Sequence, residues 1–262
     1  MTDRILLEKH GDGLVILTFN RPQSLNALDL AMMRRFAALV ADLQSDAHLR
    51  AVVLTGAGSE AFCSGGDLYE LSRYPTADDA LSFITLMGNA LLDLERLPVP
   101  IIAAINGYAL GGGSEIAIAC DLRFVDQAAQ MGFVQINMGL TPGWGAGQRL
   151  LRLVGYSKAL RLLTSGHIME ASELLALGLA DKVVEPGQAL NAALYYARRH
   201  IIRQPPAVVR SIKALLRAGL EQPYEQALGT DRHLFPALWA DKPHLEAVDH
   251  FLKRQQTKKD DV

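Results

Sequence analysis

The run Gly111–Gly113, followed by Ser114 and Glu115, is the sequence feature that most constrains how this chain folds. It lies between the apolar, strand-like residues 100–105 and the apolar residues 116–119, which indicate a buried helix. Glycines let the backbone approach a ligand closely, and the first turn of a helix has unpaired N–H groups. Those donors favour a developing negative charge. Such glycines also occur where a helix simply packs closely on a strand, so a second feature is needed to indicate an anion-binding site.

A second glycine-rich segment supplies that feature. The apolar residues 51–55 lead into residues 56–60, and the chain then continues to Ser64, Gly65 and Gly66. Two loops that each offer one backbone N–H form a two-donor oxyanion hole, in which the loss of one donor costs about 3 kcal/mol of transition-state stabilisation. We therefore predict that the two loops meet, with Glu115 beside the bound oxygen.

Further segments repeat a known order of motifs. They are residues 20–28, 62–68, 104–115, 119–123, 138–143, 148–150 and 178–184. In this order the chain resembles the enoyl-CoA hydratase/isomerase (crotonase) family over nearly its whole length. The strands and helices by themselves indicate only the α/β class. The resemblance implies a crotonase-like spiral of repeated ββα units over residues 1–203, with the acyl-CoA site, and a C-terminal helical oligomerisation region over residues 204–262.

The resemblance also implies catalytic roles. The peptide N–H groups of Ser64 and Gly112 would bind the thioester oxygen of an acyl-CoA, and Glu115 would act as acid or base. Gln135 stands where hydratases of the family carry a second acidic residue. An amide orients a molecule by hydrogen bonding but does not exchange a proton near neutral pH.

Substrate contacts are implied in the same way, from a loop on the adenine side, the two glycine loops and the C-terminal helices. The positions are Ser24, Leu25, Ala27, Ser64, Gly65, Gly66, Asp67, Leu68, Gly111, Gly112, Trp144, Phe235, Phe251 and Arg254. Two of them have equally simple structural interpretations. Asp67 is also a good helix cap, and Trp144 either excludes water from the acyl end or is a packing anchor.

The substitution at Gln135 bears on the reaction. Hydration needs one group to take a proton from water and another to deliver one to carbon, which paired carboxylates do well. Decarboxylation of a malonyl-type thioester needs only stabilisation of the enolate and later protonation, so Glu115 alone suffices. The pattern around residues 138–145 resembles the acyl-CoA decarboxylase-like branch, which favours a methylmalonyl- or ethylmalonyl-CoA substrate. The alternatives are a hydratase with an atypical second residue and a non-catalytic scaffold that binds a CoA thioester or RNA.

Composition and charge argue against several other classes of protein. A formal net charge of −2 argues against a general nucleic-acid binder and an electrostatic membrane anchor. No apolar run approaches the ~20 residues that span a bilayer, and the first residues lead directly into a strand-like segment, so we expect a cytoplasmic protein. Cys63 and Cys120 fit reduced packing residues, and the histidines show no metal-ligand spacing. We expect no permanently bound cofactor, coenzyme A being part of the substrate, and a homotrimer or homohexamer.

Local patterns predict individual elements. Residues 5–8 and 14–19 indicate a hairpin across a glycine turn, and Asp29 is placed to cap a helix. A helix is expected over residues 81–94 and a strand over 122–125. In the C-terminal region we expect helices over residues 207–218, 224–229 and 243–255.

Overall fold

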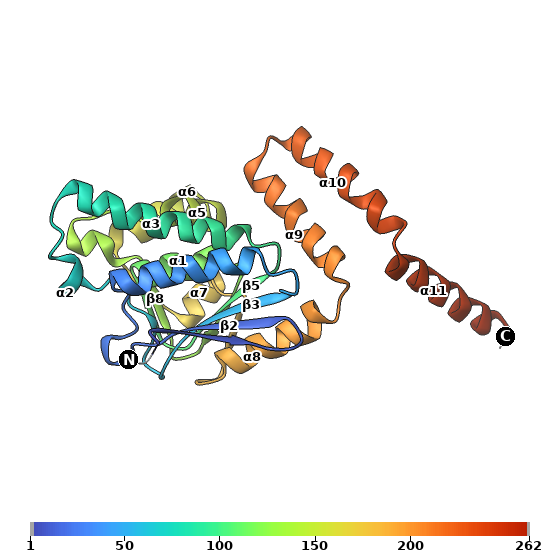
Figure 1. Ribbon diagram of the computed structural model, residues 1–262, viewed down its shortest axis with the longest axis horizontal. Helices are drawn as coiled ribbons and strands as arrows, with labels where there is room; N and C mark the ends of the chain where they lie inside the picture. The colour runs from blue at the N-terminus through green and yellow to red at the C-terminus, as the bar shows by residue number, and fades with distance from the viewer. Residues whose placement is uncertain (1–2, 261–262) are drawn as a thin grey trace. The chain divides into compact units, whose positions relative to one another are not determined.

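The computed structural model describes the backbone of residues 3–260 and the side chains of residues 3–254. The chain divides into two compact units, Met1–Ile202 and Arg203–Val262. The first unit combines strands and helices, whereas the second is helical (Figure 1). The predicted α/β class is therefore confirmed, and each unit is described below by itself.

Two sheets form the framework of the first unit. A six-stranded sheet has the order β1-β2-β3-β5-β7-β10, and a four-stranded sheet has the order β4-β6-β8-β9. The hairpin predicted near the N-terminus is confirmed, because β1 and β2 pair antiparallel with Ile5 opposite Phe19, and β2, β3, β5, β7 and β10 then run parallel. The strands are β1 (Ile5–Lys9), β2 (Leu14–Phe19), β3 (Ala51–Gly56), β4 (Ala61–Cys63), β5 (Ile101–Ile105), β6 (Tyr108–Leu110), β7 (Leu122–Asp126), β8 (Gln130–Gly132), β9 (Ile168–Glu170) and β10 (Lys182–Val184).

Helices cover both faces of the six-stranded sheet. In Figure 1, α1 and α3 lie side by side over one face and α8 lies over the other. This explains why every residue of β3 and β5 is buried, since a parallel sheet covered on both sides has no solvent face. The helices of this unit are α1 (Leu30–Gln44), α2 (Leu68–Leu71), α3 (Ala77–Arg96), α4 (Gly112–Ala119), α5 (Ala146–Val154), α6 (Tyr156–Ser165), α7 (Ala171–Leu177) and α8 (Ala189–Tyr196), with short helical turns η1 (Pro22–Ser24), η2 (Val134–Met138) and η3 (Ala197–Ile202).

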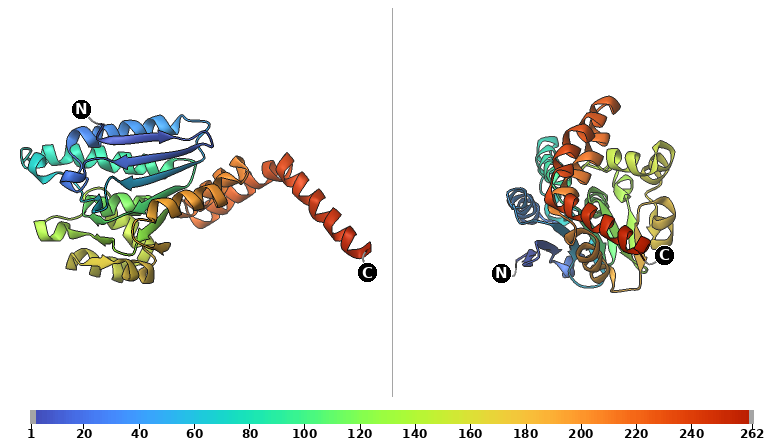
Figure 2. Two further views of the ribbon diagram at one scale, coloured as in Figure 1. Left: turned by 90° about the horizontal axis from the view of Figure 1, so that it is seen from below. Right: turned by 90° about the vertical axis from the view of Figure 1, so that its right-hand side faces the viewer.

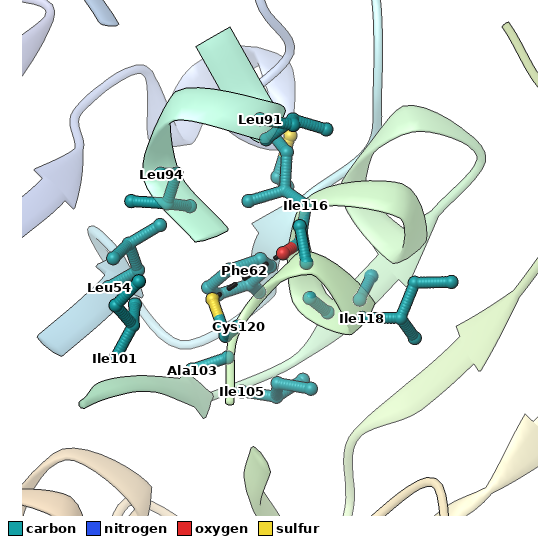
Figure 3. Close-up of a cluster of buried hydrophobic side chains, with 14 of the residues drawn as sticks. Leu54, Phe62, Leu91, Leu94, Ile101, Ala103, Ile105, Ile116, Ile118 and Cys120 are labelled. Atoms are coloured by element: carbon teal, nitrogen blue, oxygen red, sulfur yellow. Dashed lines mark hydrogen bonds between the residues drawn. The ribbon is translucent and has the colours of Figure 1, made fainter. Parts of the chain in front are cut away.

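A continuous apolar core fixes the position of α4, the helix that carries Glu115. Figure 3 shows Phe62 of β4 among side chains from β3, β5, α3 and α4. Those labelled are Leu54, Leu91, Leu94, Ile101, Ala103, Ile105, Ile116, Ile118 and Cys120. The burial of one Leu or Ile side chain contributes roughly 1.5–3 kcal/mol, so the glycine-rich start of α4 is held by apolar packing rather than by its own helix propensity.

The second unit consists of α9 (Pro206–Glu221), α10 (Tyr224–Trp239) and α11 (Lys242–Asp260). α9 and α10 pack on each other, and α11 points away from them (Figure 2). Few of its described residues are buried, while Leu216 and Phe235 are 63% and 61% exposed. None of the helices in the described part of the chain is both long and apolar enough to cross a bilayer.

Several elements differ from the sequence prediction. Helix α3 begins at Ala77, before the predicted 81, because Thr76 and Asp79 form a capping box with reciprocal hydrogen bonds. Helix α10 runs to Trp239, well beyond the predicted end at 229. The predicted Asp29 cap is confirmed, since its Oδ1 accepts the Met32 N–H at 2.8 Å.

Candidate active site

Glu115 is the buried acid of the site. It lies in the first turn of α4 and is only 2% exposed. Four donors reach its carboxyl group: Gln135 Nε2 and Gly143 N bind Oε1 at 2.9 and 3.2 Å, while Trp144 N and Ala146 N bind Oε2 at 2.8 and 3.0 Å. The residues around position 144 were expected only as a loop at the acyl end, so the three main-chain donors are a feature that the sequence did not reveal.

Two opposing effects act on the proton affinity of Glu115. Burial raises the pKa of its carboxyl group above the ordinary value, because the charged form loses its hydration. The hydrogen bonds from Ala146, Trp144, Gly143 and Gln135 favour the charged form and offset only part of that increase. A carboxyl group with a raised pKa can hold a proton closer to neutral pH, which a proton donor requires.

Gln135 lies beside Glu115 on the helical turn η2, which ends at Gly139 in a left-handed conformation. Its Nε2 donates to Glu115, whereas its Oε1 is buried and has no hydrogen-bond partner among the described residues. Buried polar atoms are nearly always paired, so this oxygen is suited to a donor from a bound molecule.

The two glycine loops meet as predicted from the sequence. A Cβ atom added to Gly113 would lie 1.8 Å from the carbonyl oxygen of Cys63, and one added to Gly65 would lie 2.9 Å from the Gly112 amide nitrogen. Glycine is therefore needed on both sides, because any side chain would push the loops apart. Gly111 also requires glycine, since it has φ 54° where it caps α4. Gly112 is the first residue of α4, and its N–H is one of the four without an intrahelical acceptor.

The structure corrects the prediction for Ser64. Its N–H donates to the Leu25 carbonyl at 3.0 Å, so this amide has no hydrogen left for a ligand. Gly66 lies two residues further along and forms a parallel bridge with Leu28. The hydrogen bonds of this bridge involve its neighbours: Leu28 N donates to Gly65 O, and Asp67 N donates to Leu28 O. The Gly66 N–H itself makes no hydrogen bond within the described residues. The amide that this loop offers beside Gly112 is therefore that of Gly66.

The loop of Ser24, Leu25 and Ala27 lies against this glycine loop, through the Ser64–Leu25 bond and the bridge. Leu25 and Asn26 have φ of 49° and 56°, a left-handed conformation that is unusual for residues other than glycine. Asn26 stabilises it, because its side chain donates to Ala57 O and Ala61 O at 3.0 and 2.7 Å. Asn26, which was not among the predicted site residues, joins the loop to the β3–β4 region.

Asp67 acts as a helix cap, the simpler of its two predicted roles. Its Oδ1 accepts the Tyr69 N–H at 3.1 Å, and its Oδ2 pairs with Arg21 Nη2 at 2.9 Å. Burial alone would raise the pKa of Asp67, but the Arg21 hydrogen bond and charge and the backbone hydrogen bonds lower it overall. Leu68, the first residue of α2, is exposed.

Trp144 packs directly on Gly112 at the start of α4. A Cβ atom added to Gly112 would lie 2.2 Å from Cζ3 of its ring, so the indole contacts the Gly112 backbone. Arg149 holds the turn, because its Nη1 donates to Trp144 O and its Nε pairs with Glu95, both at 2.6 Å. Arg149 belongs to one of the motifs that carry the family resemblance, where it had no predicted role. Its contacts indicate that it holds the turn around Trp144 in place.

The remaining predicted positions lie apart from this site in the chain. Phe235, Phe251 and Arg254 belong to the second unit, where they are exposed, and their contact with coenzyme A stays a prediction. Cys63 and Cys120 are both buried and unlinked by a disulfide. Within the described residues there is no cluster of His, Cys, Asp or Glu that could hold a metal ion.

Solved structures place this arrangement in a known class. An enoyl-CoA hydratase from Bacillus anthracis superposes with a TM-score of 0.90 at 30% identity, over 96% of this chain and 97% of that one. An enoyl-CoA hydratase from Mycobacterium smegmatis superposes equally well, at 31% identity. Together with the two mainly parallel sheets and the glycine loops, these likenesses define a protein of the crotonase fold.

Sequence comparison names the family. The enoyl-CoA hydratase/isomerase model matches residues 9–261, and the chain belongs to this family. A short-chain-enoyl-CoA hydratase from Clostridium acetobutylicum is 34% identical over 97% of this chain and 96% of that protein. An ethylmalonyl-CoA decarboxylase from Gallus gallus is 35% identical over 93% of this chain and 82% of that protein. Both reactions are thus represented among relatives of similar identity.

Proposed function

We propose that this protein is an acyl-CoA lyase that decarboxylates a short malonyl-type thioester of the methylmalonyl or ethylmalonyl kind. The observation that carries the proposal is the composition of the site: one carboxyl group, Glu115, has an amide, Gln135, as its side-chain neighbour in place of a second acid. The likeness to ethylmalonyl-CoA decarboxylases supports it.

In the proposed mechanism the Gly66 and Gly112 amides bind the thioester oxygen. The bond between the α-carbon and the carboxylate breaks, carbon dioxide leaves, and the electron pair passes into the thioester as an enolate. Amides fixed toward that oxygen stabilise the charge as it develops and need no rearrangement. No base is needed to abstract a proton.

Glu115 then completes the reaction. Its acid proton passes to the α-carbon of the enolate, which gives the saturated acyl-CoA, and a proton from solvent restores the acid. The raised pKa of Glu115 supports this role, since the residue must carry a proton when the enolate forms. The Trp144 ring, buried against Gly112, reduces access of water to the same region.

One specific observation favours hydration as the second candidate. The buried Oε1 of Gln135 lacks a partner among the described residues, and it could accept a hydrogen bond from a water molecule next to Glu115. In that case Glu115 would have to take the proton from water and return it to carbon, which makes both transfers depend on one group.

Mass spectrometry separates the candidates. The protein is incubated in parallel with ethylmalonyl-CoA, methylmalonyl-CoA and crotonyl-CoA, and the thioester products are weighed. Loss of one carbon dioxide from a malonyl substrate supports the proposal, whereas gain of one water by crotonyl-CoA, with no carbon dioxide lost, identifies a hydratase. Thioester binding without any product would instead indicate a scaffold. A Glu115→Gln sample serves as the matched control for non-enzymatic loss of carbon dioxide.

A further inference from the structure

The aromatic ring of Trp144 occupies the space that a side chain at position 112 would fill. An added Cβ atom on Gly112 would lie 2.2, 2.6 and 2.8 Å from the ring carbons Cζ3, Cη2 and Cε3. These three atoms belong to the six-membered ring, and Trp144 is only 6% exposed. The bulk of the indole therefore lies beside one of the two amides to which we assign the thioester oxygen.

The main chain around Trp144 is fixed from both sides. Its N–H donates to Glu115 Oε2 at 2.8 Å, and its carbonyl accepts Arg149 Nη1 at 2.6 Å. Arg149 is in turn paired with Glu95 of α3. A residue whose peptide groups are bound in this way cannot move far without losing charged hydrogen bonds, which are stronger than neutral ones.

A second apolar side chain supports the same turn. Ile84 of α3 packs on Gly143, where an added Cβ atom would lie 3.1 Å from the isoleucine Cγ1. Ile84 thus contacts Gly143, the residue before Trp144, and the amides of both Gly143 and Trp144 bind Glu115. With a thioester placed between Gly112 and Glu115, as proposed above, the group that extends from its α-carbon lies next to Trp144 and Ile84.

We propose that Trp144, supported by Ile84, sets the upper limit of acyl-chain length and restricts the site to short acyl groups. This inference rests on the proposed placement of the thioester between Gly112 and Glu115. A pocket that lacks room for one further methylene discriminates by roughly 10- to 200-fold, so the limit should be visible within two or three added carbons. Removal of the indole should open the pocket and remove the limit.

Binding of saturated acyl-CoA thioesters tests this inference without any turnover. Dissociation constants for butyryl-, hexanoyl- and octanoyl-CoA are measured by calorimetry on the wild-type protein, Trp144→Ala and Ile84→Ala. We expect the wild type to lose at least tenfold in affinity from butyryl- to octanoyl-CoA. Trp144→Ala should bind octanoyl-CoA at least as tightly as butyryl-CoA, and Ile84→Ala should give an intermediate profile.

Matched variants keep the result interpretable. Tyr156→Ala removes an exposed aromatic side chain at the start of α6 and should retain the wild-type profile. Trp144→Leu keeps an apolar side chain in the turn and replaces Trp144→Ala if the latter fails to fold. A wild-type protein that binds octanoyl-CoA as tightly as butyryl-CoA would overturn the inference, as would folded Trp144 variants that keep the wild-type profile. Because no step of the assay requires decarboxylation, the proposed reaction can fail while this chain-length profile stands.

Discussion

The two units of the chain differ in how far their large apolar side chains are buried. In the first unit, the sheets and helices enclose a core of fully buried leucine, isoleucine and phenylalanine side chains, as around Phe62. In the second unit, Leu216, Phe235 and Phe251 are mostly exposed on α9, α10 and α11. The first unit thus contains its own core and the whole of the Glu115 site, whereas the second presents an apolar surface suited to association with another protein chain. We expect that chain to be a further copy in a trimer or hexamer.

The largest expected effect falls in the first unit, at Glu115. Glu115→Gln should lower turnover by roughly 10²- to 10⁴-fold while thioester binding stays nearly intact, because the acid that protonates the α-carbon is lost. Glu246→Gln in the second unit removes only an exposed partner of Lys242 and should leave turnover unchanged. Steady-state rates of product formation compare the two variants, and equal rates for both would remove Glu115 from the chemistry.

Leucine-to-alanine substitutions test the contrast in burial. Leu54→Ala should lower the free energy of unfolding by about 2–5 kcal/mol, because it leaves a cavity in the core. Leu216→Ala should change it by less than about 0.5 kcal/mol in dilute protein, since the side chain is 63% exposed. Urea titrations at several protein concentrations give both values. A Leu216→Ala effect that grows with concentration would show that another copy covers this surface.

The pH dependence of turnover tests the raised pKa of Glu115. Above that pKa the folded enzyme loses the proton it must donate, so the rate should fall about tenfold per pH unit. The same group binds its proton more tightly in the folded than in the unfolded chain. Its contribution to stability is therefore present below the unfolded pKa and is lost as pH rises through the folded one. A pH–rate profile without an alkaline limb would contradict the role of Glu115 as the acid.

A smaller loss than that of Leu54→Ala is expected at the cap of α2. Asp67→Ala should lower the free energy of unfolding by about 1 kcal/mol, because it removes both the cap and the Arg21 ion pair. Asp67→Asn keeps a capping oxygen and should cost less, so its own loss reports the charge, and the difference between the two variants reports the cap. Thermal unfolding measures both variants, and a large loss in Asp67→Asn would show that the ion pair dominates.

Local patterns in the sequence predicted the features that depend on a few neighbouring residues. The Asp29 cap and the hairpin before it are of this kind. The meeting of the two glycine loops is long-range, and it was predicted because an oxyanion hole needs two amide donors. Helix α3 was predicted too short, although Thr76 and Asp79 carry a capping signal that could have been used. Helix α10 extends beyond its predicted end because it continues past Gly229 and through Pro236, two residue types that normally weaken or end a helix.

Within the site, the missing information was long-range. The main-chain donors to Glu115 come from Gly143, Trp144 and Ala146, about thirty residues away. Hydrogen bonds over this separation cannot be predicted from patterns among neighbouring residues. The choice between Ser64 and Gly66 depended on which amide pairs with the Leu25–Leu28 segment, which is a matter of register between two loops. From the sequence, the amide donor of this loop was assigned to Ser64, two residues before Gly66, whose N–H has no partner among the described residues.

A crystal structure with a non-reacting ethylmalonyl-CoA analogue would test the central claim most directly. The account predicts a thioester oxygen about 2.7–3.1 Å from the amide nitrogens of both Gly66 and Gly112, with Ser64 still bound to Leu25 and the α-carbon facing Glu115. An oxygen bound to the Ser64 amide, or an acyl group held in the separate cavity of about 570 Å³ lined by Glu60, Asn106 and Tyr108, would contradict it.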